Sequence, residues 1–183
     1  RTQNDNNFID TNYISRLAVN YVIRAATYQQ QGRIADAVIE LQEALKIDKS
    51  ASIYYALAKN YDLMYKPHLA IENALLALKS DSLFTPAMEL LGDLYSNQHR
   101  FNDAIVMYEQ IYKINPEKSN QLRMAYVYQL TNPQKSISLL EDYLKDNNDA
   151  FIMLELVKLY KSTNNTEKLT ETIVRLDKIA DSQ

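Results

Sequence analysis

A tyrosine recurs along this chain at a nearly constant interval, with 33, 34, 33 and 32 residues between successive copies. Two other series keep the same spacing, one of mostly small residues three positions before each tyrosine and one that begins at Ala37. A period of this length is typical of repeat architectures, in which each repeat is one supersecondary unit. We therefore divide the chain into a polar lead that extends the first helix, residues 1–17, and a single domain of five units, 18–50, 51–84, 85–117, 118–149 and 150–183. The tyrosines are Tyr28, Tyr61, Tyr95, Tyr128 and Tyr160.

Each unit has the pattern of two helices joined by a turn. In the first half of the second unit, apolar residues stand at i, i+3, i+4 and i+7, which is one face of a helix (Tyr54, Leu57, Ala58 and Tyr61). A second such face follows in the same unit (Ala70, Ala74, Ala77 and Leu78). Pro67 lies between them, where a proline is tolerated as the first residue of a helix. No strand-like alternation occurs, so the sequence predicts an all-α fold.

The small residues of the two series predict where helices approach closely. Bulky side chains at these positions would push the two helices of a pair apart, at a cost of roughly 1–3 kcal/mol. We expect the tyrosines and leucines to fill the wider gaps between units. The small residues are Ala25, Ala58, Gly92 and Ala125 in the first helices, and Ala37, Ala70, Ala104 and Ser136 in the second.

The third unit carries the most complete motif, Met88-x-x-Leu91-Gly92-x-x-Tyr95 followed by Phe101-x-x-Ala104-x-x-x-Tyr108 and Pro116. This pattern resembles the tetratricopeptide repeat family. The resemblance implies a right-handed superhelical solenoid of about five helix-turn-helix repeats, whose first helices line a concave groove. The sequence departs from the family at Arg24, where a leucine is usual, and in the fourth unit, where each turn is one residue short. The turn glycine present at Gly32 is replaced by Tyr65, His99, Asn132 and Asn164.

The composition excludes several kinds of chemistry. The 183 residues include no cysteine, which rules out disulfides and thiolate zinc sites, and only two glycines, which argues against phosphate-binding loops. The net charge of −3 disfavours a nucleic-acid partner, and no apolar run is long enough to span a membrane. His68 and His99 lie near turns, where we expect both to be exposed. We predict no cofactor, no metal and no enzymatic activity.

The leading functional hypothesis is a non-catalytic scaffold that binds a peptide or a helix of a partner protein in the groove. The alternative is a structural module that forms homo-oligomers, such as a homodimer, within a larger assembly, for example in the cell envelope. An RNA-binding helical repeat is a third hypothesis. The expected groove residues are Tyr55, Lys59, Asp62, Glu89, Asp93, Leu122, Tyr126, Gln129, Lys158 and Lys161.

The compartment is not fixed by the sequence. The chain begins at Arg1 rather than at Met, so we expect an excised or processed piece of a longer protein. The abundance of Asn and Tyr and the lack of Cys favour an exported bacterial protein, and a cytoplasmic scaffold is the alternative.

Overall fold

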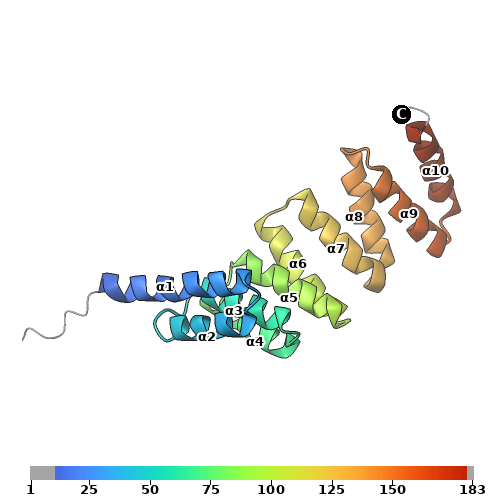
Figure 1. Ribbon diagram of the computed structural model, residues 1–183. Helices are drawn as coiled ribbons and strands as arrows, with labels where there is room; N and C mark the ends of the chain where they lie inside the picture. The colour runs from blue at the N-terminus through green and yellow to red at the C-terminus, as the bar shows by residue number, and fades with distance from the viewer. Residues whose placement is uncertain (1–10, 181–183) are drawn as a thin grey trace, which may run out of the picture. The chain divides into compact units, whose positions relative to one another are not determined.

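The computed structural model describes residues 11–180, with side chains from Arg16 onward, and these residues form helices joined by short turns without any strand (Figure 1). Residues 1–10 of the predicted lead lie outside the described residues. The helices of the described part are α1 (Thr11–Gln30), α2 (Ile34–Leu45), α3 (Ala51–Leu63), α4 (Pro67–Ser80), α5 (Thr85–Asn97), α6 (Phe101–Ile114), α7 (Lys118–Thr131), α8 (Pro133–Lys145), α9 (Ala150–Ser162) and α10 (Thr166–Ala180).

The chain divides into two compact units, the first ending at Leu94 and the second beginning at Tyr95, within helix α5. The core of the first unit is made of alanines, leucines and other aliphatic side chains. One cluster joins α1 and α2 to α3 through Leu41, Ala44, Ile53 and Leu57, and tyrosines pack on its edge. Ala58, Ala70, Ala74 and Ala77 have no exposed surface, which confirms that small residues occupy the close approaches of these helices.

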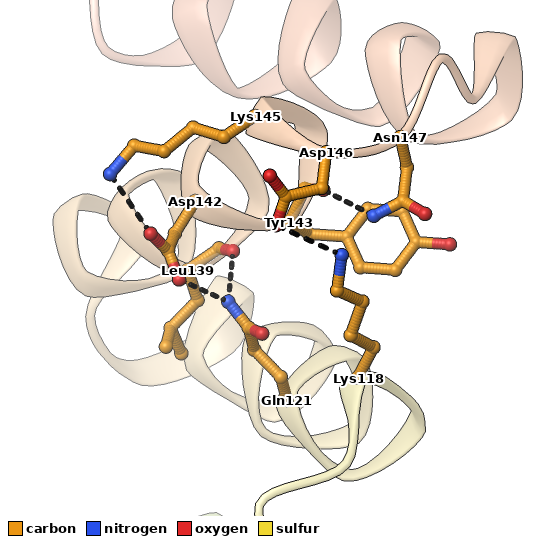
Figure 2. A network of polar contacts seen from close by, with 8 residues as sticks. All are labelled: Lys118, Gln121, Leu139, Asp142, Tyr143, Lys145, Asp146 and Asn147. Carbon is orange, nitrogen blue, oxygen red and sulfur yellow. Dashed lines mark hydrogen bonds and ion pairs between the residues drawn. The ribbon is translucent and has the colours of Figure 1, made fainter.

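In the second unit, helices α7 and α8 are joined by polar contacts (Figure 2). The buried amide of Gln121 on α7 donates to the Leu139 carbonyl at 2.9 Å and to the Asp142 carboxylate at 3.1 Å, both on α8. The Ser136 hydroxyl, also buried, donates to the Ala125 carbonyl at 2.8 Å. Lys118 pairs with Asp146 at 3.2 Å at the edge of the same interface. The apolar core of this unit lies beside these contacts, between α7, α8 and α9.

Four turns within helix pairs share one backbone conformation. Gly32 has a φ of 73°, and Tyr65, His99 and Asn164 have φ of 56°, 58° and 56°. In each case the following amide donates to a carbonyl of the preceding helix, as Arg33 does to Tyr28 at 2.9 Å and Lys66 to Tyr61 at 2.9 Å. This is the hydrogen-bonding pattern that ends a helix with a left-handed residue, a position that favours glycine.

The turn of the fourth unit is different and shorter. Asn132 alone separates α7 from α8, with an extended φ of −148°. Its amide donates to the Tyr128 carbonyl at 2.7 Å, and its side-chain oxygen accepts from the Lys135 amide at 3.1 Å. One asparagine therefore ends the first helix and caps the second, which is how the shortened repeat is accommodated.

Three of the repeated tyrosines connect their helix pair to the preceding helix. In the first unit, the Tyr61 hydroxyl accepts from the Gln42 amide at 3.2 Å. In the second, the Tyr128 hydroxyl donates to Glu109 at 2.5 Å and the Tyr160 hydroxyl donates to Glu141 at 2.6 Å. Lys135 pairs with Glu109, and Lys168 pairs with Glu141. The same position thus forms a neutral contact in one unit and charged networks in the other.

Candidate protein-binding surface

The ten residues predicted to bind a partner form two groups, one in each compact unit. Tyr55, Lys59 and Asp62 lie on α3 and Glu89 and Asp93 on α5, all in the first unit. Leu122, Tyr126 and Gln129 lie on α7 and Lys158 and Lys161 on α9, in the second unit.

In the first unit, Tyr55 lies near two of the other predicted residues, Lys59 and Glu89. It is half-buried, and its ring packs edge-on against Phe84 with centroids 5.7 Å apart. The Lys59 ammonium lies 5.7 Å from the centroid of the Tyr55 ring, within the range of a cation–π contact. Burial raises the pKa of the Tyr55 hydroxyl, and the charge of Glu89 raises it further. The ring therefore packs on Phe84 while its surroundings include one positive and one negative side chain.

The remaining members of the first group are acidic. Asp62 is exposed on α3, three residues beyond Lys59. Asp93 is exposed on α5 and Glu89 is half-buried four residues before it, so the two share one helical face. Three carboxylates and one ammonium make this surface acidic.

In the second unit, Leu122 and Tyr126 are half-buried and pack on the core cluster below them. Burial raises the pKa of the Tyr126 hydroxyl, as do the nearby charges of Glu155 and Asp149. The phenol is therefore neutral at pH 7 and can donate a hydrogen bond. The buried Nε2 atom of Gln129, one turn further along α7, has no hydrogen-bond partner within the described residues.

Helix α9 contributes the basic part of the second group. Lys158 is exposed and pairs with Glu155 at 2.6 Å, and the Glu155 side chain is itself largely covered. Lys161 is exposed three residues further along the helix. The charges of Glu155 and Lys158 both act on the pKa of the Tyr126 hydroxyl, so of the predicted α9 residues Lys158 is the one that lies near Tyr126.

Two residues of these surfaces were not predicted from the sequence. Phe84 supplies the packing partner of Tyr55, and Glu155 connects Lys158 to Tyr126. Phe84 stands directly before α5, outside the helix that carries Tyr55, so spacing along α3 could not have identified it. The spacing of Glu155 and Lys158, three residues apart on a helix, could have indicated their ion pair.

Other kinds of site were sought in the same residues. No group of His, Asp or Glu among the described residues could hold a metal ion. His68 and His99 are both exposed, as predicted. In the part of the chain that the structure describes, no helix is both long and apolar enough to cross a membrane.

The comparisons with known proteins concern the repeats. The tetratricopeptide repeat family model matches residues 18–50 and 85–118. No curated protein matches the sequence significantly. Among solved structures, Pseudomonas aeruginosa PilF is 23% identical, with a TM-score of 0.65 over 90% of this chain and 77% of that one.

Two further solved structures agree over a similar length. MamA from Desulfovibrio magneticus RS-1, from its residue 41 to its end, is 14% identical, with a TM-score of 0.74 over 91% of this chain and 96% of that one. A tetratricopeptide repeat protein from Parabacteroides merdae is 16% identical, with a TM-score of 0.76 over 91% of this chain and 68% of that one. These likenesses confirm the fold, a helical-repeat solenoid.

Proposed function

Because residues 18–50 and 85–118 match the tetratricopeptide repeat family, we propose that the chain is a non-catalytic scaffold that binds peptide or helical segments of partner proteins through two surfaces, one on α3 and α5 and one on α7 and α9. The observation that carries the proposal is the placement of Tyr55 and Tyr126. Each is half-buried, held on one side by packing and surrounded by charged side chains. Tyrosines held in this way offer contact area and a polar tip at low entropic cost, as binding hot spots do.

The surface of the second unit suits a partner segment with an apolar anchor and a negative charge. Leu122 and Tyr126 supply apolar area, and Lys158 and Lys161 are positive and exposed. The Tyr126 phenol adds a hydrogen-bond donor beside them. A short acidic and apolar segment, either extended or helical, would meet all three features.

The surface of the first unit favours a different charge. Asp62, Glu89 and Asp93 outnumber Lys59, so a partner segment with basic side chains fits it better. Charge arrangements of this kind act mainly on specificity and association rate. The proposal is therefore that apolar anchors supply most of the affinity and that charges select the partner.

The test is affinity capture from lysate followed by titration of the identified partner. The native chain is compared with Tyr55→Ala and Tyr126→Ala, and Tyr65→Ala serves as the matched control because Tyr65 is 92% exposed and lies outside both surfaces. We expect Tyr126→Ala or Tyr55→Ala to weaken binding by roughly 1–2 kcal/mol, as truncation of an anchor does. Circular dichroism of each variant separates lost binding from lost structure.

Tyr→Phe variants at both positions refine the result, because they keep the packing and remove only the hydroxyl. A partner that binds the native chain, Tyr55→Ala and Tyr126→Ala with equal affinity would show that these faces are not the binding surface. Sedimentation at two protein concentrations tests the alternative of homo-oligomerisation.

A further inference from the structure

The last described helix, α10, buries less of its apolar surface than the other second helices, although Leu169, Leu176 and Ile179 pack against the core of the second unit. The preceding second helices, α2, α4, α6 and α8, each bury four side chains. Although α10 is fully described, no side chain of it is buried. Ile173, at the centre of its apolar stripe, is 42% exposed, and Leu154 on the neighbouring α9 is 48% exposed. Between them lies a hollow of 450 Å³.

The residues that line this hollow correspond, position by position in the repeat, to a surface that is covered in the first unit. Leu154, Val157, Ile173 and Leu176 line the hollow. Their equivalents at the same repeat positions are Val22, Ala25, Leu41 and Ala44, and all four belong to the cluster that packs against Ile53 and Leu57 of α3. The hollow on α9 and α10 is therefore the counterpart, from one end of the repeat series to the other, of the surface on α1 and α2 that α3 covers.

The second unit itself contains another surface of this kind, on α7 and α8, which is covered by α9. Leu122, Ala125, Leu140 and Tyr143 stand at the same repeat positions on α7 and α8, and they pack with Ile152 and Leu156 of α9. Both of these surfaces are covered by a helix with aliphatic side chains at i and i+4. The two pairs are Ile53 and Leu57 on α3 and Ile152 and Leu156 on α9. The hollow on α9 and α10 continues this internal interface by one repeat.

We propose that the α9–α10 hollow is a second interaction site, which binds an amphipathic helix of a partner protein with aliphatic residues at i and i+4. Asp177 is the one charged residue that lines the hollow. Its repeat position is occupied by Leu45 and Leu144 in the two covered surfaces. The partner helix therefore carries a Lys or Arg next to its aliphatic pair. This site is separate from the two proposed surfaces around Tyr55 and Tyr126.

In the repeat register of Ile53 and Leu57, the first helix of a second copy does not provide such an occupant. Asn20 and Arg24 of α1 stand at the repeat positions of Ile53 and Leu57, and both are exposed. Arg24 is held in place by Glu40 at 2.8 Å and by the ring of Tyr21, 4.6 Å from its guanidinium carbon. The polar residues Asn20 and Arg24 therefore disfavour the first helix of a second copy in that register.

The probe is a labelled synthetic peptide that copies residues 50–64, which span α3. This helix is chosen because it covers the equivalent surface on α1 and α2. Its binding to the whole chain is followed by fluorescence anisotropy. We expect saturable binding, and Ile173→Asp in the chain lowers the association constant at least about tenfold, since a carboxylate replaces a buried aliphatic contact. A peptide with Leu57→Asp loses binding to the same extent.

The matched control is Ile39→Asp, because Ile39 is 56% exposed on α2 and lies outside the hollow. We expect it to leave the association constant unchanged. If Ile173→Asp reduces helicity by circular dichroism, Leu154→Asp replaces it, since Leu154 lines the hollow from the other helix. Equal binding to the native chain and to the folded hollow variant would overturn the proposal, as would no saturable binding at a peptide concentration of about 1 mM.

Sedimentation velocity of the chain alone tests whether a second copy of the chain, rather than a partner protein, occupies the hollow. If the native chain self-associates and Ile173→Asp abolishes this, the hollow binds a second copy, and the assignment to a partner protein is wrong. A monomer in both cases, together with peptide binding, supports the proposal.

Discussion

The α3–α4 pair of the first unit and the α7–α8 pair of the second unit are built on the same repeat but are joined by different chemistry. Ala58, Ala70 and Ala74 give the first pair an apolar contact without exposed surface. In the second pair, Gln121 and Ser136 occupy core positions and donate to backbone carbonyls of the neighbouring helix. The difference shows that the repeat brings its two helices into contact, and that either the burial of apolar side chains or hydrogen bonds between the helices can stabilise this contact.

The two kinds of contact respond differently to change. Burial of aliphatic surface depends little on pH or salt, and its loss leaves a cavity. Networks of buried polar groups depend on every partner being present, because a donor or acceptor left alone in the core is destabilising.

The largest effect is expected for Leu57→Ala in the first unit. Leu57 is 2% exposed, so its truncation should lower the free energy of unfolding by about 2–5 kcal/mol, measured by urea denaturation. Leu83→Ala, at a residue 67% exposed, is the control and should change it by less than about 0.5 kcal/mol. In the second unit Gln121→Met should have a smaller effect than Leu57→Ala, because Met153 fills the same repeat position in α9. A larger loss for Gln121→Met would show that the polar contacts contribute more than burial.

The second expected effect is a dependence on pH that arises in the tyrosine networks of the second unit. Hydrogen bonds from Tyr128 and Lys135 lower the pKa of the Glu109 carboxyl. At Glu141 burial acts to raise the pKa, but hydrogen bonds from Lys168 and Tyr160 outweigh it and the pKa is lowered. A carboxyl whose folded pKa is depressed stabilises the fold above its unfolded pKa, and this contribution is lost as the pH falls through the folded value.

The measurement is the free energy of unfolding between about pH 6 and pH 3, since an unfolded glutamate titrates near 4.3. We expect the native chain to lose stability over this range more steeply than the double variant Glu109→Gln, Glu141→Gln. Gln42→Ala, which removes the neutral Tyr61 contact of the first unit, should leave the pH profile unchanged. Parallel profiles for the native chain and the double variant would show that the two networks do not contribute to acid sensitivity.

The smallest effect concerns the turns, where the two units are alike. Tyr65 in the first unit and His99 in the second both have a left-handed backbone. Tyr65→Gly and His99→Gly should each raise the free energy of unfolding, by about 1 kcal/mol, because glycine adopts this conformation without strain from a Cβ atom. Gly32→Ala should lower it by a similar amount. If Tyr65→Gly and His99→Gly changed the free energy of unfolding in opposite directions, the turns of the two units would also differ.

Much of the fold followed from periodicity alone. The spacing of Tyr54, Leu57, Ala58 and Tyr61 predicts one buried helical face, and the structure buries Leu57 and Ala58 within α3. The candidate surface was predicted less completely. Sequence spacing placed Tyr55 and Lys59 on one face of a helix, but it gave no sign that Phe84 would pack on the ring. Phe84 lies outside the helix of Tyr55, and spacing along one helix carries no information about contacts from outside it.

The sequence by itself determined the repeat, the helical faces, the all-α class and the absence of thiol chemistry, because these depend on residue type and on spacing within one helix. Only the tertiary structure decided that Glu109 and Glu141 accept from the tyrosines, that Gln121 replaces an apolar contact, and that Ile173 is uncovered. Each of these depends on which side chain of the next helix lies opposite. That choice is made by the packing of neighbouring helices, and a local pattern does not contain it.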